Sequence, residues 1–271
     1  MRSYQVMLDG LRIACCESTG KGQPILFIHG NSLSGLCFRR QLESPLARQY
    51  RCIALDLPGH GRSAPAPNPA DDYTLPGYAA VVTRLIEQLG LQRPILGGWS
   101  LGGHILLEAA GSISDAAGLV LFGTPPVGNP IAADAFQSHP AVQLFFKKQL
   151  TAEDVQNMAA ACFCPGTQAS SDVVEQITAS DGRARELLGA SIAAGNYTDE
   201  IAVVAGLNIP VAVMHGEKDR LISLPYLKRL PIPRLWRGEI QVIPDAGHAP
   251  HWEQPERFNS VLMQFIAENG C

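Results

Sequence analysis

Short apolar runs alternate along most of this chain with segments whose apolar residues recur every three or four positions. Such alternation is typical of βαβ units, in which a helix carries the chain from one strand of a parallel sheet to the next. Because the apolar runs are nearly continuous, both faces of the sheet need a cover of helices. The sequence therefore predicts an α/β fold, a mostly parallel central sheet flanked by helices, with strands at residues 23–29, 51–56, 94–98, 118–123, 210–215 and 239–244.

The succession of strands breaks between residues 124 and 204, where the sequence is rich in alanine and has helical patterns. An insert at this point would lie over the carboxyl ends of the core strands, where open α/β sheets bind ligands. We therefore predict a core of residues 1–123 and 205–271, with residues 124–204 inserted as a helical cap that serves as a lid. Thr151 is the expected N-cap of one cap helix, and the cap helices are expected at residues 144–150, 151–163 and 170–188.

Ser100 is the candidate nucleophile. It lies in the segment GWSLG, which follows an apolar strand and opens a helical stretch. This strand-turn-helix setting is what a nucleophile elbow requires, because the flanking glycines let the backbone turn tightly and leave the serine hydroxyl exposed above the sheet. A phosphate loop would need a lysine after its last glycine, and no such lysine follows here.

A serine hydroxyl is a weak nucleophile until a base removes its proton, so a histidine and an orienting acid are needed elsewhere in the chain. Asp219 follows the predicted strand 210–215, and His248 follows the predicted strand 239–244. The order Ser100, Asp219, His248 is the one that α/β folds with a nucleophile elbow use. We predict that these three residues form a catalytic triad.

Two neighbours compete with these assignments. His251 is an alternative base, but it begins a segment that reads as a helix entry, so we expect it at the surface or in a wall of the site. Glu217 is an alternative acid, yet it comes directly after a glycine, too early in the turn to reach the imidazole. The set His248, His251 and Glu253 lacks the helical context of a zinc protease, so we expect no metal and no other cofactor.

Acyl transfer also needs donors for the oxygen on which negative charge builds up. The loop HGNS follows a predicted strand, and we assign the backbone N–H groups of Asn31 and Leu101 to an oxyanion hole. The Asn31 side chain is expected either to contact the substrate or to shape the loop as an Asx-turn. His60, in a glycine-rich turn after another strand, is expected to be structural.

The net charge of −4 gives no basic field that could hold phosphates, so nucleic acid and anionic membranes are not expected partners. The N-terminal residues MRSYQVMLDG do not resemble a signal peptide, and there is no run of about 18 apolar residues, so we expect a cytoplasmic protein. Seven cysteines without a regular spacing are expected to be reduced. The oligomeric state is left open.

Taken together, these motifs resemble the α/β-hydrolase superfamily, through HGNS, DLPGHGRS, GWSLGG, GEKD and AGH in this order. More narrowly, GWSLGGHI, GTPPV, DGRAR and AGHAP resemble the metal-independent N-acyl-homoserine lactonases, which open the lactone ring of bacterial quorum-sensing signals. The resemblance implies Ser100 as nucleophile, His248 as base, Asp219 as orienting acid, and Asn31 with Leu101 as the oxyanion hole beneath a helical cap.

The insert carries nine acidic and four basic residues, a balance that disfavours anionic substrates. A small neutral ester or lactone with an apolar chain fits better, and we expect Asn31, Trp99 and Met158 to contact it. Other reactions of the same fold stay open: a general carboxylesterase, an enol-lactone or carbon–carbon bond hydrolase, or a cofactor-free haloperoxidase. A ligand-binding receptor built on a hydrolase scaffold is a further alternative.

Overall fold

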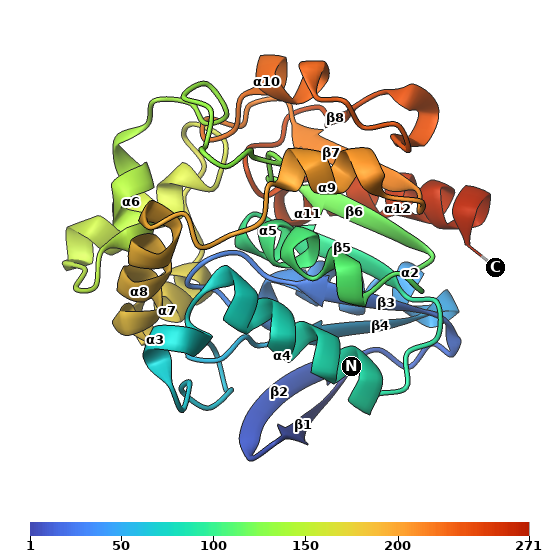
Figure 1. Ribbon diagram of the computed structural model, residues 1–271, viewed down its shortest axis with the longest axis horizontal. Helices are drawn as coiled ribbons and strands as arrows, with labels where there is room; N and C mark the ends of the chain where they lie inside the picture. The colour runs from blue at the N-terminus through green and yellow to red at the C-terminus, as the bar shows by residue number, and fades with distance from the viewer. Residues whose placement is uncertain (271) are drawn as a thin grey trace.

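The computed structural model describes residues 1–270 and shows an eight-stranded, mostly parallel sheet between two layers of helices (Figure 1). The strand order is β1-β2-β4-β3-β5-β6-β7-β8, and all pairs from β4 to β8 are parallel. The predicted fold class is confirmed, and each of the six predicted strands has its counterpart in the sheet. The strands are β1 (Arg2–Leu8), β2 (Leu11–Glu17), β3 (Gly22–Ile28), β4 (Tyr50–Leu55), β5 (Ile95–Trp99), β6 (Gly118–Phe122), β7 (Val211–Gly216) and β8 (Gln241–Ile243).

The sequence analysis did not predict β1 and β2, which form an antiparallel hairpin at one end of the sheet. The hairpin turns at Asp9 and Gly10, whose φ angles of 49° and 88° are both positive. Two-residue turns of this kind favour an Asp-Gly pair, because glycine and aspartate tolerate positive φ better than most residues. This dipeptide was the signal that could have revealed the hairpin.

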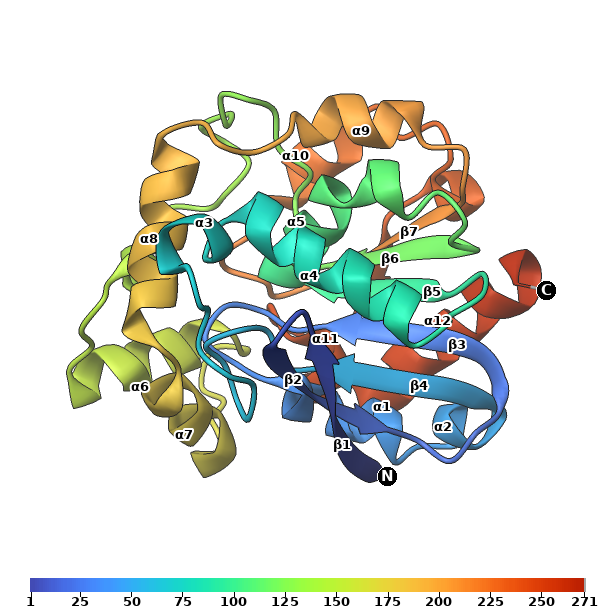
Figure 2. The same ribbon diagram turned by 60° about the horizontal axis from the view of Figure 1, so that its bottom comes forward.

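Helices cover both faces of the sheet (Figures 1 and 2). Neighbouring strand residues alternate between two hydrophobic clusters: Leu26 and Ile28 belong to one cluster, whereas Ile25 and Phe27 belong to the other. Both clusters are buried, as expected for strands covered on each side. One layer holds α4 (Leu75–Gln88), α5 (Leu101–Glu108) and α9 (Glu200–Gly206), and the other holds α1 (Arg39–Leu42), α2 (Leu46–Gln49), α11 (Pro250–Glu253) and α12 (Pro255–Asn269).

Between β6 and β7 the chain leaves the sheet and forms a group of helices at one end of the molecule (Figure 1). These are η3 (Pro140–Phe146), α6 (Ala152–Ala161), α7 (Ser171–Ala179) and α8 (Gly182–Ala193); two short helices, α3 (Pro69–Asp72) and α10 (Leu224–Arg229), lie outside this insert.

The helices of the insert differ in part from those predicted. Thr151 is the N-cap of α6, as expected, and forms a capping box with Asp154. The predicted helix 144–150 is wrong, because the chain there is a 3₁₀ helix that ends at Phe146. The predicted helix 170–188 is two helices, since the Asp181 side chain caps α8 by accepting from the backbone N–H of Arg183.

The predicted boundary at residue 204 falls inside α9. Helix α9 packs against α5, a helix of the sheet layer. We therefore propose that the core resumes at Glu200 rather than at residue 205, and that residues 124–199 form the cap.

The carboxyl ends of the parallel strands gather the predicted site residues at one edge of the sheet. The loop after β3 carries Asn31, and β5 leads directly to Ser100. The loops after β7 and β8 carry Asp219 and His248. No helix within residues 1–270 is long and apolar enough to span a membrane. The six cysteines in this range form no disulfide, and Cys271 lies outside the described residues.

The Gly216→Ala variant tests how closely the loops carrying Asp219 and His248 are packed. A Cβ at Gly216 would overlap the backbone carbonyl of Gly247, so we expect the free energy of unfolding to fall by roughly 1–3 kcal/mol. Gly206→Ala is the matched control, because a Cβ there meets open space and should leave stability unchanged or slightly higher. Urea unfolding measures both, and equal stabilities would contradict the prediction.

Candidate active site

The backbone at Ser100 has a strained conformation, with φ 52° and ψ −117°. Residues other than glycine rarely adopt positive φ, and such strain is common at functional sites. Gly98 and Gly102 make the turn possible. A Cβ at Gly98 would overlap the backbone of the first turn of α5, and a Cβ at Gly102 would overlap the carbonyl of Ile28. The predicted nucleophile elbow geometry is therefore present.

Hydrogen bonds with β6 and with Thr124 just after it hold the turn at Ser100. The Ser100 N–H donates to the carbonyl of Phe122 at 2.9 Å, and the hydroxyl of Thr124 donates to the Ser100 carbonyl at 2.8 Å. The N–H of Gly103 donates to the same carbonyl at 3.0 Å, which starts α5. Both polar backbone groups of Ser100 are thus satisfied, while its side chain lines a cavity.

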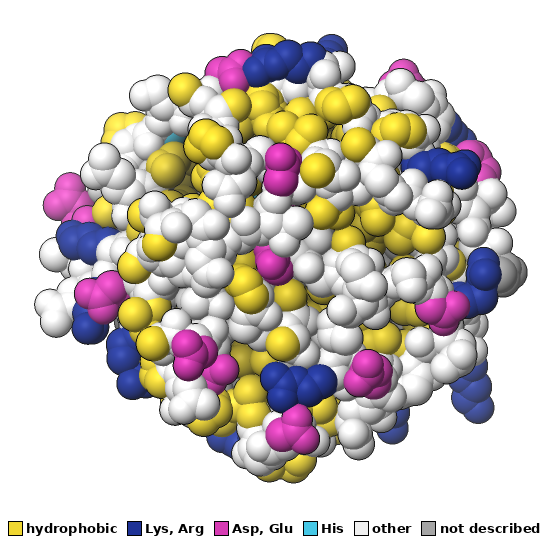
Figure 3. Space-filling view, in the orientation of Figure 1, with side chains coloured by type: hydrophobic (Ala, Val, Ile, Leu, Met, Phe, Trp, Pro, Cys, Tyr) yellow, Lys and Arg dark blue, Asp and Glu magenta, His cyan; other side chains and the backbone are white. Residues whose placement is uncertain are grey.

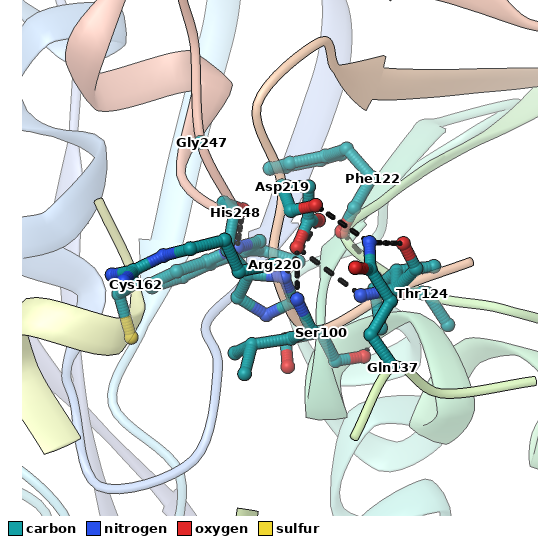
Figure 4. Close-up of polar contacts among 12 residues, drawn as sticks. Ser100, Phe122, Thr124, Gln137, Cys162, Asp219, Arg220, Gly247 and His248 are labelled. Atoms are coloured by element: carbon teal, nitrogen blue, oxygen red, sulfur yellow. Dashed lines mark hydrogen bonds and ion pairs between the residues drawn. The ribbon is translucent and has the colours of Figure 1, made fainter. Parts of the chain in front are cut away.

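Asp219 and His248 form a buried pair. Asp219 Oδ2 lies 2.9 Å from Nδ1 of His248, and its Oδ1 accepts from the backbone N–H groups of Leu221 and Ile222 (Figure 4). Burial alone would raise the pKa of Asp219, but the charge and hydrogen bond of His248 and the backbone donor outweigh it and lower the pKa. An ionised Asp219 accepts the Nδ1 hydrogen, so the neutral imidazole has its lone pair on Nε2.

The imidazole of His248 lines the same cavity as Ser100. No hydrogen bond joins these two side chains in this conformation. Gln137 fixes the aspartate loop, because its Nε2 donates to the carbonyls of Asp219 at 2.7 Å and Ile222 at 2.8 Å (Figure 4). Sequence analysis did not identify Gln137, which belongs to the cap and has no motif around it.

The backbone N–H groups of Asn31 and Leu101 make no hydrogen bond to other residues between 1 and 270. Both residues line the cavity that Ser100 enters. The Asn31 side chain is not an Asx-turn: its Nδ2 donates to the carbonyl of Phe145 at 2.8 Å, and its Oδ1 accepts from Ser32 at 2.8 Å. It therefore joins the loop after β3 to the cap.

Arg185 makes a second connection between the cap and this loop. Its buried guanidinium donates to the hydroxyls of Ser32 at 3.2 Å and Ser180 at 2.6 Å, and to the carbonyls of Lys147 and Lys148. Burial lowers its pKa despite the nearby charge of Asp181. Because all its acceptors are neutral, the guanidinium holds the cap against the loop by hydrogen bonds rather than by an ion pair.

The cavity has a volume of about 290 Å³ and lies between the strand ends and the cap. On the face seen in Figure 3, hydrophobic side chains also lie in a hollow beside the insert, at the upper left. Besides Asn31, Ser100, Leu101 and His248, the cavity is lined by the polar side chains of His104, Tyr197 and Glu200 and by apolar ones: Leu75, Val127, Ile131, Phe136, Val142, Phe145, Phe146, Leu188, Ile192, Leu221 and Ile222.

The side chains of two residues expected to contact the substrate are buried away from the cavity. Trp99 does not line the cavity; its Nε1 donates to the backbone carbonyl of His248 at 2.8 Å and so holds the loop that carries His248. Met158 is fully buried in the hydrophobic cluster under α6 and does not reach the cavity. The helical pattern alone could not tell which face of α6 points to the site.

His251 is in the core rather than at the surface, which corrects that expectation. Its ring is fully buried beside Phe38, Trp99 and Phe122, and neither ring nitrogen has a hydrogen-bond partner. Burial, with a smaller contribution from the charge of His248, lowers the pKa of His251 to about 3.

The other competing residues have structural roles. Glu217 accepts from the backbone N–H of Asp245 at 3.2 Å, away from the imidazole. Glu253 accepts from the N–H groups of Cys164 and Gly247. Within the described residues, no group of three His, Cys, Asp or Glu side chains is placed to hold a metal ion. His60 is buried, and its Nδ1 lies 3.0 Å from the carbonyl of Pro58, which agrees with a structural role.

Sequence analysis missed a second imidazole–carboxylate pair in the cavity wall. His104 Nδ1 lies 2.8 Å from Oε1 and 2.9 Å from Oε2 of the buried Glu200. His104 follows Ser100 by four residues, the spacing of one helical turn, which was the signal that could have pointed to it. Glu200 had no such signal, since it is far away in the sequence.

Acid should destabilise the protein through His251. The unfolded chain protonates His251 near pH 6.5, and the folded protein does so only near pH 3. The neutral ring therefore contributes its full share to the free energy of unfolding above pH 6.5, and this share is lost as the pH falls. At pH 5 the loss is about 2 kcal/mol. We expect His251→Phe to lose less free energy of unfolding than the wild type between pH 7 and pH 5, as measured by urea unfolding. Parallel pH profiles would contradict this.

With the geometry of the site described, comparison with known proteins gives its context. The chain is 34% identical to a variant of the N-acyl homoserine lactonase AidH complexed with N-hexanoyl homoserine lactone; the TM-score is 0.96, covering 100% of this chain and 99% of that one. The AB hydrolase superfamily protein YisY of Bacillus subtilis is 27% identical, covering 92% of this chain and 93% of the relative. The non-heme haloperoxidase of Rhodococcus erythropolis is also 27% identical, covering 91% and 93%. Residues 25–261 match the family described as "Alpha/beta hydrolase family", and the chain therefore belongs to the alpha/beta hydrolase family.

Proposed function

We propose that this protein is a serine hydrolase that opens the lactone ring of N-acyl homoserine lactones. The observation that carries the proposal is the placement of Ser100, on a strained elbow, in the same apolar cavity as His248, whose other ring nitrogen pairs with Asp219. A hydroxyl, a base and an orienting acid on separate strand ends are the parts that nucleophilic acyl transfer needs.

In the proposed mechanism, Nε2 of His248 takes the Ser100 proton as the hydroxyl attacks the carbonyl carbon. Asp219 keeps the Nδ1 hydrogen in place and stabilises the imidazolium that forms. The backbone N–H groups of Asn31 and Leu101 hold the oxyanion, where each donor contributes about 3 kcal/mol to transition-state binding. The protonated His248 then gives its proton to the leaving alkoxide, and water hydrolyses the acyl-enzyme.

A lactone adds a constraint, because its leaving hydroxyl stays attached to the acyl group. Such a tethered group attacks the acyl-enzyme with an effective molarity that can reach roughly 10⁵ M or more. Productive hydrolysis therefore needs the hydroxyl arm to swing away from the ester, or water to attack the lactone directly with His248 as base. The cavity extends from Ser100 beneath the cap. This space supports the view that the displaced hydroxyl group can move away from the ester.

The walls of the cavity support a neutral substrate with an apolar chain. Phenylalanine and aliphatic side chains from the cap surround most of the space. The charged residue in the wall, Glu200, is acidic and buried, so a carboxylate or phosphate would meet repulsion without solvent screening. The similarity to the lactonase AidH over the full chain favours an acyl homoserine lactone among such substrates.

A second candidate is a cofactor-free haloperoxidase or an esterase of the same family, which the similarity to the Rhodococcus erythropolis haloperoxidase favours. Enol-lactone and carbon–carbon bond hydrolysis use the same parts. Three assays separate these activities. Proton release measures the hydrolysis of N-hexanoyl homoserine lactone and of 4-nitrophenyl hexanoate, and a third assay measures bromide-dependent halogenation with peroxide. A kcat/KM for the lactone at least as high as for the aryl ester supports lactonase activity, whereas tight binding without turnover would favour a receptor.

The Ser100→Ala variant should lose hydrolysis of N-hexanoyl homoserine lactone by about 10⁴-fold or more in kcat. The cause is the loss of the attacking oxygen, since the alanine keeps the backbone conformation. Proton release at constant pH measures the rate, and urea unfolding checks that stability is retained. A folded variant with nearly full activity would show that Ser100 is not the nucleophile.

The Asp219→Asn variant should lower kcat by about 10³–10⁴-fold, because an amide favours the wrong tautomer of His248. Glu217→Gln is the matched control: this carboxylate lies two residues earlier and accepts a bond from Asp245 instead. We expect the control to keep kcat within about twofold of the wild type. The same steady-state assay measures both, and equal losses in the two variants would contradict the assignment of Asp219.

A further inference from the structure

Two histidines line the cavity, each paired with a buried carboxylate, and the proposed mechanism uses one of these pairs. The other pair is His104 with Glu200. Glu200 is almost completely buried, and its Oε2 also accepts from the backbone N–H of Val127 at 2.8 Å. The carboxylate is thus held on two sides and in turn fixes the orientation of the imidazole ring.

The other nitrogen of His104 is available to a ligand. Nε2 makes no hydrogen bond to any residue in the described part of the chain, and the ring forms part of the cavity wall. The His104 side chain keeps 16% of its surface exposed, in contrast to 1% for Glu200. The structure therefore presents one oriented polar nitrogen in a wall that is otherwise mainly aliphatic and aromatic.

We propose that Nε2 of His104 binds the amide next to the reacting carbonyl of the substrate and so selects N-acylated lactones over alkyl lactones. This inference rests on the proposed function, because it assigns a specificity-determining residue to the same site. The ligand chemistry is a secondary amide whose nitrogen is attached to the carbon beside the reacting carbonyl.

The chemistry of the pair favours an N–H group as the partner. Because Glu200 accepts the hydrogen on Nδ1, the neutral imidazole offers a lone pair on Nε2, which can accept from an amide N–H. A purely aliphatic chain at this position would leave Nε2 without water and without a partner. Unpaired polar groups in a site discriminate strongly against ligands that lack the matching group.

The position along α5 also agrees with this contact. The backbone N–H of His104 donates to the carbonyl of Ser100 at 3.4 Å, so the two residues are one helical turn apart. Four residues of helix advance about 6 Å along the axis. In an N-acyl homoserine lactone the amide nitrogen is two bonds from the carbon that Ser100 attacks, which brings the amide within reach of a side chain one turn away.

Binding to the Ser100→Ala protein tests the inference without requiring turnover. Isothermal titration calorimetry gives the Kd values of N-hexanoyl homoserine lactone and of α-heptyl-γ-butyrolactone, which has the same ring and a chain of similar length but no amide. We expect the protein with His104 to bind the amide ligand about tenfold more tightly.

Three further variants in the same Ser100→Ala background separate specificity from stability. The double change His104→Phe with Glu200→Gln should abolish the preference, and the glutamine avoids a buried, unpaired carboxylate. Glu200→Gln alone should weaken the preference without removing the ring, because an amide beside Nδ1 favours the tautomer of His104 in which Nε2 carries the hydrogen. His104→Gln should restore part of it, since a glutamine amide can donate to Glu200 and accept from the ligand. Urea unfolding confirms that each variant folds.

A preference that is present with His104, lost with phenylalanine and partly restored with glutamine supports the inference. Equal Kd values for the two ligands, no detectable binding of the amide ligand, or a preference that survives His104→Phe overturns it. The wild-type assay of lactone hydrolysis is independent of this result. Hydrolysis without a preference rejects the role of His104 alone, and a preference without hydrolysis rejects the lactonase function alone.

Discussion

The turn at Ser100 holds a side chain in a backbone conformation that glycine adopts more readily, with φ at 52°, and the rest of the site is arranged around it. Strain of this kind persists where the surroundings over-determine it. Here the carbonyl of Phe122 and the hydroxyl of Thr124 bind the turn, and close packing leaves no space for a Cβ at Gly98 or Gly102. Since β5 is a central strand, loops from both sides of the sheet can converge on the serine.

The cavity above this turn combines an apolar wall with paired ionisable groups. Asp219 and Glu200 are both buried carboxylates, and each accepts hydrogen bonds from the Nδ1 of a histidine and from a backbone N–H. Pairing of this kind keeps charge inside the protein without unmatched polar atoms. His251 shows the opposite arrangement, because its ring is packed among aromatic side chains and remains uncharged over most of the pH range.

Much of this arrangement was predictable from sequence, because local patterns determine it. Six strands and the positions of Ser100, Asp219 and His248 at strand ends follow from apolar runs and short motifs. What could not be predicted depends on the direction of side chains and on contacts between distant segments. Met158 and Trp99 lie on buried faces that periodicity did not identify. The pairing of His104 with Glu200 joins residues 96 positions apart, which no local pattern records.

Arg185 attaches the cap to the loop after β3 through a single buried cation. The residues that shape the cavity, such as Phe145 and Leu188, belong to the same cap but take no part in the support of the elbow. Substitutions there would change the shape of the cavity while the turn at Ser100 keeps its hydrogen bonds. The fold in this way separates the side chains that give the cavity its shape from the backbone that holds the serine.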